Sequence, residues 1–208
     1  MARDLPSLLD PSHTALVTQE CQRGVIGDLA VLPELADAAR DSGAIAQMGR
    51  LVTAARAAGV DVIHCLARHR ADRKGANTNA RLFGAMGRLP DALRQGTESV
   101  ALIPEIGAEA SDVVLARYHG LGPMYDTGLD SVLRNLGVTT VVGIGVSLNV
   151  GMLDLAFDAV NAGYQFVLPR DAVAGVPPEY GEAVIENTLS LVATVVTADD
   201  VIRAWPPM

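Results

Sequence analysis

Three short segments of the chain carry groups suited to chemistry, and each follows an apolar, strand-like run. Glu20 ends the run over residues 13–20, and Arg117 ends the run over residues 112–117. The third segment, residues 143–152, is glycine-rich and leads from a β-branched run into a helical pattern. A carboxylate suits general acid/base work, and a guanidinium binds carboxylates or carbonyls through its planar fork. The free amides of a helix start suit an anion or a developing oxyanion.

The order of the elements predicts how these segments meet. Strand and helix patterns alternate, which is typical of an α/β fold with a doubly wound, Rossmann-like, mainly parallel sheet and helices on both faces. The carboxyl ends of parallel strands lie at one edge of the sheet, where such proteins bind ligands. We therefore expect Glu20, Arg117 and the amides of residues 143–152 to converge on one pocket, within a single domain over residues 1–208.

Hydrophobic periodicity gives the expected elements. The predicted strands cover residues 13–20, 60–66, 112–117, 139–142, 165–168 and 195–196. The predicted helices cover residues 36–58, with a break near Ser42 and Gly43, and residues 128–136, 150–160 and 179–192. Residues 68–107 form a longer irregular section with one or two short helices, and loops of this length are usually functional or mobile.

Composition excludes several classes of function. The chain has 208 residues, 50% of them hydrophobic, and a net charge of −8, with no basic stripe interleaved with aromatics, so we expect no nucleic-acid binding. Residues 1–9 lack the pattern of a signal peptide, and no apolar run approaches the roughly 20 residues that span a bilayer. Cys21 and Cys65 lie in apolar runs without metal-ligand or disulfide spacing, which predicts two core residues. These features indicate a soluble cytoplasmic protein without a membrane partner.

The order and spacing of four blocks, between about residues 14 and 202, resemble the isochorismatase-like hydrolase family. The blocks are Glu20-Cys21-Gln22; residues 54–60; residues 112–117 with 122–130; and residues 143–152 with Asp158-Ala159 and Gly163-Tyr164. The resemblance implies that the pocket is an active site. It also implies a non-proline cis peptide between Val146 and Ser147.

The departures from the family pattern concern its catalytic positions. Glu20 stands where the family has aspartate, Arg117 where it has lysine, and Gly151 where it usually has cysteine; one extra residue also separates Arg117 from Thr127. In the thiol members, the resemblance implies, aspartate activates cysteine for attack on an amide or nitrile-like carbon. Without the thiol this covalent route is closed. Acid/base catalysis by the carboxylate remains, as in family members that lack the cysteine and cleave a vinyl ether.

The resemblance assigns roles to particular positions. Glu20 would be the general acid/base, Arg117 the substrate anchor, and Gly151 part of an anion hole; the substrate-binding candidates are Val146, Ser147, Gln22 and His119. A glutamate is one methylene longer than aspartate, and we expect the space at Gly151 to accommodate it. The structural alternatives stay open: an ion pair between Glu20 and Arg117 that locks the pocket, and a neutral loss at Gly151.

The histidines and the basic residues give weaker signals. The Asp-x-His pattern of a nicotinamidase metal site is missing around His69, so we expect no catalytic metal and no cofactor. A basic cluster is either a solvated loop or an attractor of anionic substrates; its members are Arg68, His69, Arg70, Arg73 and Lys74.

These observations predict a cysteine-independent hydrolase that cleaves a C–N or ether bond in a small carbonyl-containing or anionic molecule. The alternative is a non-catalytic family member, serving as a small-molecule binding protein or a structural oligomer. No particular substrate follows from the sequence. We also expect a homo-oligomer, with apolar surface supplied by Tyr118, Met124, Tyr125, Met152 and the helix over residues 150–160.

Overall fold

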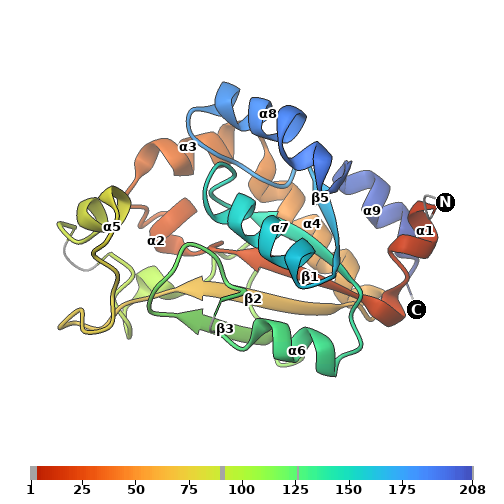
Figure 1. Ribbon diagram of the computed structural model, residues 1–208, viewed down its shortest axis with the longest axis horizontal. Coiled ribbons are helices and arrows are strands. Elements are labelled where there is room, and N and C mark those ends of the chain that lie inside the picture. Colours follow the sequence, from red (N-terminus) through yellow and green to blue (C-terminus); the bar gives the residue numbers. More distant parts are fainter. Residues whose placement is uncertain (1–3, 90–91, 126, 208) are drawn as a thin grey trace.

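The structure is a computed structural model that describes residues 4–89, 92–125 and 127–207, so Asp126 of the family blocks lies outside the described residues. Six strands form one sheet in the order β3-β2-β1-β4-β5-β6, and all the described pairings are parallel (Figure 1). The predicted doubly wound α/β fold is thereby confirmed. The strands are β1 (Thr14–Gln19), β2 (Asp61–Ala67), β3 (Val113–Arg117), β4 (Thr140–Gly145), β5 (Gln165–Pro169) and β6 (Thr194–Val196).

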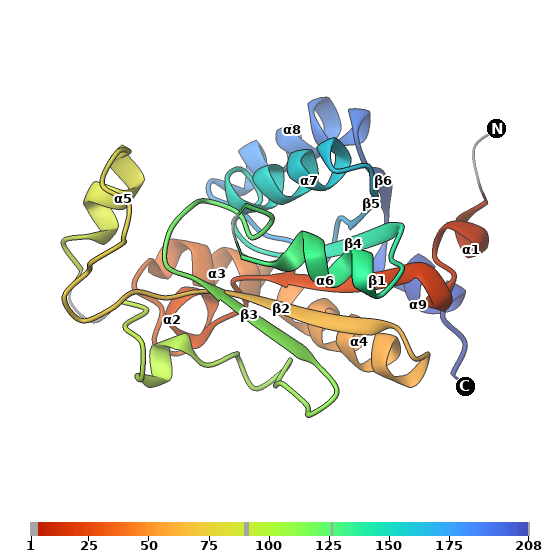
Figure 2. The same ribbon diagram turned by 60° about the horizontal axis from the view of Figure 1, so that its bottom comes forward.

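Helices cover both faces of the sheet (Figure 2). One face packs against α1 (Leu5–Leu8), α2 (Arg23–Ile26), α3 (Pro33–Asp41), α4 (Ala44–Ala57) and α9 (Ala198–Ala204). The other face packs against α6 (Leu129–Asn135), α7 (Gly151–Asn161) and α8 (Pro178–Asn187). The remaining short elements are α5 (Arg81–Met86) and three 3₁₀ turns, η1 (Pro11–His13), η2 (Glu98–Val100) and η3 (Leu189–Leu191).

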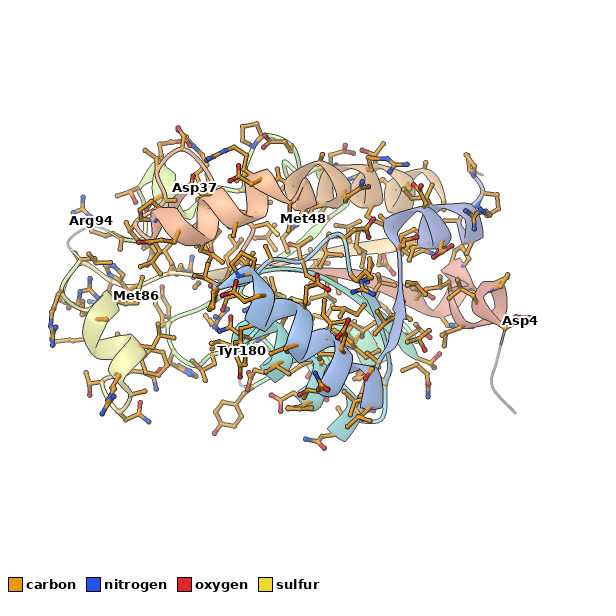
Figure 3. All side chains as sticks on the ribbon, turned by 90° about the horizontal axis from the view of Figure 1, so that it is seen from above. Asp4, Asp37, Met48, Met86, Arg94 and Tyr180 are labelled. Carbon is orange, nitrogen blue, oxygen red and sulfur yellow. The ribbon has the colours of Figure 1, made fainter. Side chains whose placement is uncertain are left out.

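The strands divide their side chains between two hydrophobic cores. Because successive strand residues point to opposite faces, Leu16 packs with α4, whereas Ala15 and Val17 pack with α6 and α7. Met48 of α4 is fully buried in the first of these cores (Figure 3). All six residues of β1 are buried, as expected for the centre of a sheet covered on both sides.

The strand order places the site. The chain runs outward from β1 through β2 to β3, then returns to the centre and runs outward in the opposite direction from β4 to β6. The change of direction lies between β1 and β4, which are paired with Gln19 opposite Gly145. Doubly wound proteins bind ligands at this crevice. Glu20 follows β1 and residues 146–151 follow β4, so the topology brings both segments to the crevice.

Two helix predictions differ from the structure in instructive ways. The predicted helix over residues 36–58 is two helices, α3 and α4, separated where expected, since Gly43 adopts φ +77°. The predicted helix over residues 179–192 is wrong in its second half. Thr188 leaves the helical conformation with φ −127° and ψ −60°, so α8 ends at Asn187 and the chain continues as η3.

Three helices have no counterpart in the sequence prediction: α1, α2 and α9. α1 and α2 have four residues each, which is too short for an apolar period to stand out, and α9 has seven. α9 begins with a capping box of Thr197 and Asp200. Trp205, after α9, donates from Nε1 to the carbonyl of Leu9 at 2.9 Å and joins the two ends of the fold. In the part of the chain that is described, no helix combines the length and hydropathy required to cross a bilayer.

Candidate active site

Glu20 occupies a strained position directly after β1. Its φ is +53°, in the left-handed region that residues other than glycine seldom adopt. Its amide still donates to the carbonyl of Cys65, while its own carbonyl accepts from the amide of Gln22 at 2.7 Å. Strain of this kind is concentrated at functional sites, where the surrounding structure maintains it.

Arg117 ends β3 and is the ion-pair partner of Glu20. Its Nη2 donates to Glu20 Oε1 and to the carbonyl of Leu121 at 3.0 Å, and Nε donates to the carbonyl of Gly120 at 3.3 Å. The side chain is only 4% exposed, against 20% for that of Glu20. Nη1 is buried and has no hydrogen-bond partner among the described residues. Because an unpaired buried donor is costly, Nη1 suits an oxygen atom of a ligand.

Glu20 and Arg117 line a cavity of about 200 Å³ at the carboxyl edge of the sheet. Ser147 and Val150, from the segment after β4, line the same cavity, and so does His119. The structure therefore brings together the three strand ends that the sequence predicts to meet. The backbone between Val146 and Ser147 is cis, as the resemblance implies.

Two of the predicted substrate-binding residues are used elsewhere. Gln22 is fully buried, and its side chain bonds the backbone of Ala67 through both amide atoms and the carbonyl of Val100 at 3.1 Å. Val146 is also fully buried, in the core that contains α4. Neither residue lines the cavity, so their prediction as substrate ligands is wrong. Instead, Gln22 fixes neighbouring backbone segments by hydrogen bonds, and Val146 packs in the core beneath the site.

The space beside Gly151 is not free for a longer acidic side chain. A Cβ atom at this position would lie 2.8 Å from Nε2 of Gln19, which is fully buried. The same Nε2 donates to Glu20 Oε1 and to the carbonyl of Leu121, both at 3.3 Å. The expectation that Glu20 uses the space at Gly151 is therefore wrong, because Gln19 occupies it. Sequence reasoning missed Gln19, which reads as the last residue of a buried strand.

Only some of the backbone amides in the turn before α7 are free to donate a hydrogen bond to a ligand. The amides of Val150 and Met152 both donate to the carbonyl of Ser147, at 3.1 and 3.0 Å. Within the described ranges, the amides of Ser147, Asn149 and Gly151 have no backbone acceptor. Of these three residues, Ser147 lines the cavity, so its amide is the candidate anion-binding donor.

Comparison with known proteins agrees with this architecture. Residues 14–200 match the isochorismatase domain. This chain belongs to the isochorismatase family. The ureidoacrylate amidohydrolase RutB of Rhizobium rhizogenes is 29% identical and aligns with 96% of this chain and 86% of its own. RutB of Methylobacterium radiotolerans is 31% identical, over 86% of this chain and 73% of its own. The solved structure of an isochorismatase family protein from Burkholderia thailandensis has a TM-score of 0.76 at 25% identity, covering 93% of this chain and 96% of that chain.

The two cysteines of this isochorismatase family member are core residues, as predicted. Cys21 packs beside Met48 with 3.8 Å between the sulfur atoms, and both cysteines are almost completely buried. Burial raises the pKa of the Cys65 thiol to about 12, and burial also raises the pKa of the Cys21 thiol. Neither thiol is a substitute nucleophile, because the reactive form is the thiolate.

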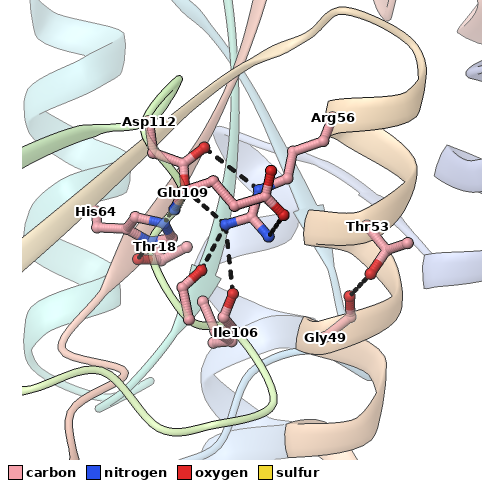
Figure 4. A network of polar contacts seen from close by, with 9 residues as sticks. Thr18, Gly49, Thr53, Arg56, His64, Ile106, Glu109 and Asp112 are labelled. Atoms are coloured by element: carbon pink, nitrogen blue, oxygen red, sulfur yellow. Dashed lines mark hydrogen bonds and ion pairs between the residues drawn. The ribbon is translucent and has the colours of Figure 1, made fainter.

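A second set of residues has the composition of a catalytic triad but is sealed inside this family member (Figure 4). Thr18 Oγ1 lies 2.9 Å from His64 Nδ1, and His64 Nε2 lies 3.1 Å from Asp112 Oδ2. Arg56 of α4 donates to the same Asp112 oxygen at 2.5 Å. The side chains of His64 and Asp112 are at most 2% exposed, and Thr18 is fully buried. No substrate reaches them, so this network joins β1, β2 and α4 and is structural.

The basic cluster is largely engaged with the protein itself. The Arg68 guanidinium lies 4.9 Å from the ring centroid of Tyr118, Arg70 pairs with Asp72, and Arg73 donates to the carbonyl of Leu89 at 2.8 Å. Arg68, His69 and Arg73 nevertheless line the cavity. The described residues contain no cluster of three or more histidine, cysteine or acidic side chains arranged to hold a metal ion.

Proposed function

We propose that this isochorismatase family member is a cysteine-independent hydrolase of a small carbonyl-containing molecule, with Glu20 as general acid/base and Arg117 as substrate anchor. The observation that carries the proposal is the buried Nη1 donor of Arg117, which has no partner in the described parts of the chain. Arg117 also lines the cavity, and buried donors in proteins are normally paired.

The proposed chemistry follows from the positions of these groups. Arg117 Nη1 donates to the substrate carbonyl oxygen and stabilises the negative charge that develops there. Glu20 takes a proton from a water molecule as the water oxygen bonds to the carbonyl carbon. The bond to the leaving nitrogen then breaks, and that nitrogen receives the proton from Glu20. The amide of Ser147, which lines the cavity, is a second donor for the same oxygen.

The similar proteins favour one bond type. The RutB relatives are ureidoacrylate amidohydrolases by name, and an amidohydrolase cleaves a C–N bond. This supports an amide or ureido substrate over an ether for the present chain. We do not assign the substrate of these relatives to the present chain, because its proposed catalytic groups are Glu20 and Arg117 and residue 151 is a glycine without a nucleophile.

A second candidate function is small-molecule binding without turnover. The observation that favours it is Gln19, whose side chain fills the place in front of Gly151. In that case the Glu20–Arg117 pair is an anchor for a ligand or a structural element, and no reaction follows binding.

One experiment separates the two candidates. Wild type and Glu20→Gln are screened against amides, ureas and enol ethers, and the melting temperature is measured for each. Glu186→Gln is the matched control, because Glu186 is exposed on α8. Turnover by wild type that Glu20→Gln loses at a nearly unchanged melting temperature supports the hydrolase. No turnover, together with a lowered melting temperature in Glu20→Gln, supports the binding protein.

A further inference from the structure

Apolar side chains from two parts of the chain line the cavity above Glu20 and Arg117. One wall is formed by Val25 of α2 and by Leu32 and Leu35 at the start of α3. A second wall comes from α5, which supplies the three apolar side chains Leu82, Phe83 and Met86. The basic residues Arg68, His69 and Arg73 line the cavity as well. A ligand whose polar group meets Glu20 and Arg117 therefore has apolar side chains of both walls in the same cavity.

Helix α5 does not pack against the body of the fold. None of its six residues is buried, and Leu82 is 41% exposed. Figure 1 shows α5 beyond the arrowheads of β2 and β3, apart from the sheet and its covering helices, and Figure 3 labels Met86 on it. Apolar side chains that a short helix leaves uncovered are typical of a binding surface.

Leu32, on the other wall, is also unusually exposed for its type. It is 39% exposed, whereas its neighbour Leu35 is buried against the core. Leu32 and Leu82 thus belong to segments some 50 residues apart in the chain, yet they line one cavity. Both side chains line the same cavity as Glu20 and Arg117.

We infer that this cleft is an alkyl- or acyl-binding subsite, so that the substrate is an amphiphile. Its carbonyl head would meet Arg117 and Glu20, and its apolar tail would lie between α5 and the wall formed by Val25, Leu32 and Leu35. The inference rests on the proposed function for the role of the head, and on the cavity walls alone for the tail.

The size of the cavity favours a tail over a protein segment. About 200 Å³ is below the roughly 300–1,000 Å³ of pockets for drug-sized ligands, so it suits a short chain or a single ring. An α-helix of a partner, about 10 Å across with its side chains, does not fit.

The test uses a homologous series of straight-chain carboxamides: acetamide, butanamide, hexanamide and octanamide. Binding is measured by calorimetry, and ammonium release is measured on the same compounds. Burial of the tail predicts about a two- to fourfold gain in affinity per methylene until the cleft is full. Amides of equal length that end in a hydroxyl group lose most of that gain.

A pair of variants locates the effect. Leu82→Ser with Phe83→Ser changes only side chains of α5 that are not buried, so the fold is preserved. This variant should lose the gain per methylene and keep the affinity for acetamide. Leu191→Ser is the control, because Leu191 is 80% exposed and does not line the cavity. It should behave as wild type.

The outcomes distinguish the subsite from the proposed hydrolase. Affinity that rises with tail length without ammonium release supports the subsite and contradicts amide hydrolysis. Ammonium release that is independent of tail length supports the hydrolase and overturns the subsite. Affinity independent of tail length, with a change in mass by light scattering when α5 is altered, also overturns the subsite and assigns α5 to an interface between copies of this chain.

Discussion

The side-chain amide of Gln19 fills the space in front of Gly151. A Cβ atom at residue 151 would approach Gln19 Nε2 to 2.8 Å, and the same nitrogen donates to Glu20 Oε1. Gln19 is fully buried, with its own Oε1 unpaired within the described part of the chain. The missing side chain at Gly151 and the presence of Gln19 are therefore two parts of one arrangement, which also holds the carboxylate of Glu20.

We expect Gly151→Ala to lower the free energy of unfolding by about 1–3 kcal/mol, as overpacking of a filled site does. The added methyl group displaces the Gln19 amide and breaks its hydrogen bond to Glu20. Urea unfolding measures the change. Gly84→Ala is the matched control, because a Cβ there meets no atom within 4 Å, and it should be neutral or stabilising.

The coupling between the two positions is tested in a double-mutant cycle. Gly151→Ala should cost much less in a Gln19→Ala background, because the smaller side chain leaves room for the methyl group. Equal costs in both backgrounds would show that Gln19 and Gly151 do not share the space.

Arg117→Lys should weaken the binding of carboxamides by about 10- to 100-fold, the loss typical of one hydrogen bond to a charged group. An ammonium group cannot pair with Glu20 and also offer the planar second donor that Nη1 provides. Calorimetry measures the affinity, and Arg134→Lys, in an exposed ion pair with Asp130, is the control. Unchanged affinity in Arg117→Lys would exclude Nη1 as the ligand donor.

The sequence predicts the convergence of Glu20 and Arg117 because that convergence depends on topology alone. Six apolar runs that alternate with helices permit a parallel sheet, and parallel strands collect their carboxyl ends at one edge. The apolar period also predicts both cysteines as core residues. These features rest on long, regular patterns.

The roles of Gln19 and Gln22 depend on local geometry that no sequence pattern encodes. Glu20 adopts a positive φ, so the chain turns at the point where a regular strand would continue. The turn sends the side chain of Gln22 to the backbone of Ala67 and leaves Gln19 beside Gly151. A glutamine is equally compatible with a ligand, a bridge or a spacer, so its role follows only from its neighbours.

Stability should fall as the pH decreases below about 6.5 because of His64. Burial lowers the pKa of His64 below its usual 6.5, so as the pH falls below 6.5 the unfolded chain takes up a proton before the folded chain does. The free energy of unfolding therefore decreases as the pH falls below about 6.5. Hydrogen bonds from Arg56, the Glu109 amide and His64 outweigh burial and lower the pKa of Asp112, so its contribution is lost only below about pH 3.8.

Urea unfolding at several pH values measures this dependence, and His64→Gln should flatten it. An NMR titration of His64 provides a second measurement where that variant is unstable. A His64 pKa above 6.5 in the folded protein would contradict the account.

The homo-oligomer stays a prediction, but the surface predicted to form its interface changes. Met152 and most of the inner face of α7 are buried within the chain, so the expectation that they supply interface surface is wrong. Tyr125, which is 73% exposed, and Phe157, which is 40% exposed, remain candidates. Light scattering at micromolar concentration should give the mass of a dimer or a larger assembly. A monomer would contradict the prediction.

Catalysis by Glu20 without a thiol is tested most directly by kcat/KM for the best amide in the screen. The measurement compares Glu20→Gln with wild type that has been treated with iodoacetamide. General acid/base catalysis predicts a loss of about 10²–10⁴-fold in Glu20→Gln. The treated wild type should keep its activity, because both cysteines are buried. Inactivation by iodoacetamide with the fold intact, or a Glu20→Gln variant as active as wild type, would contradict the account.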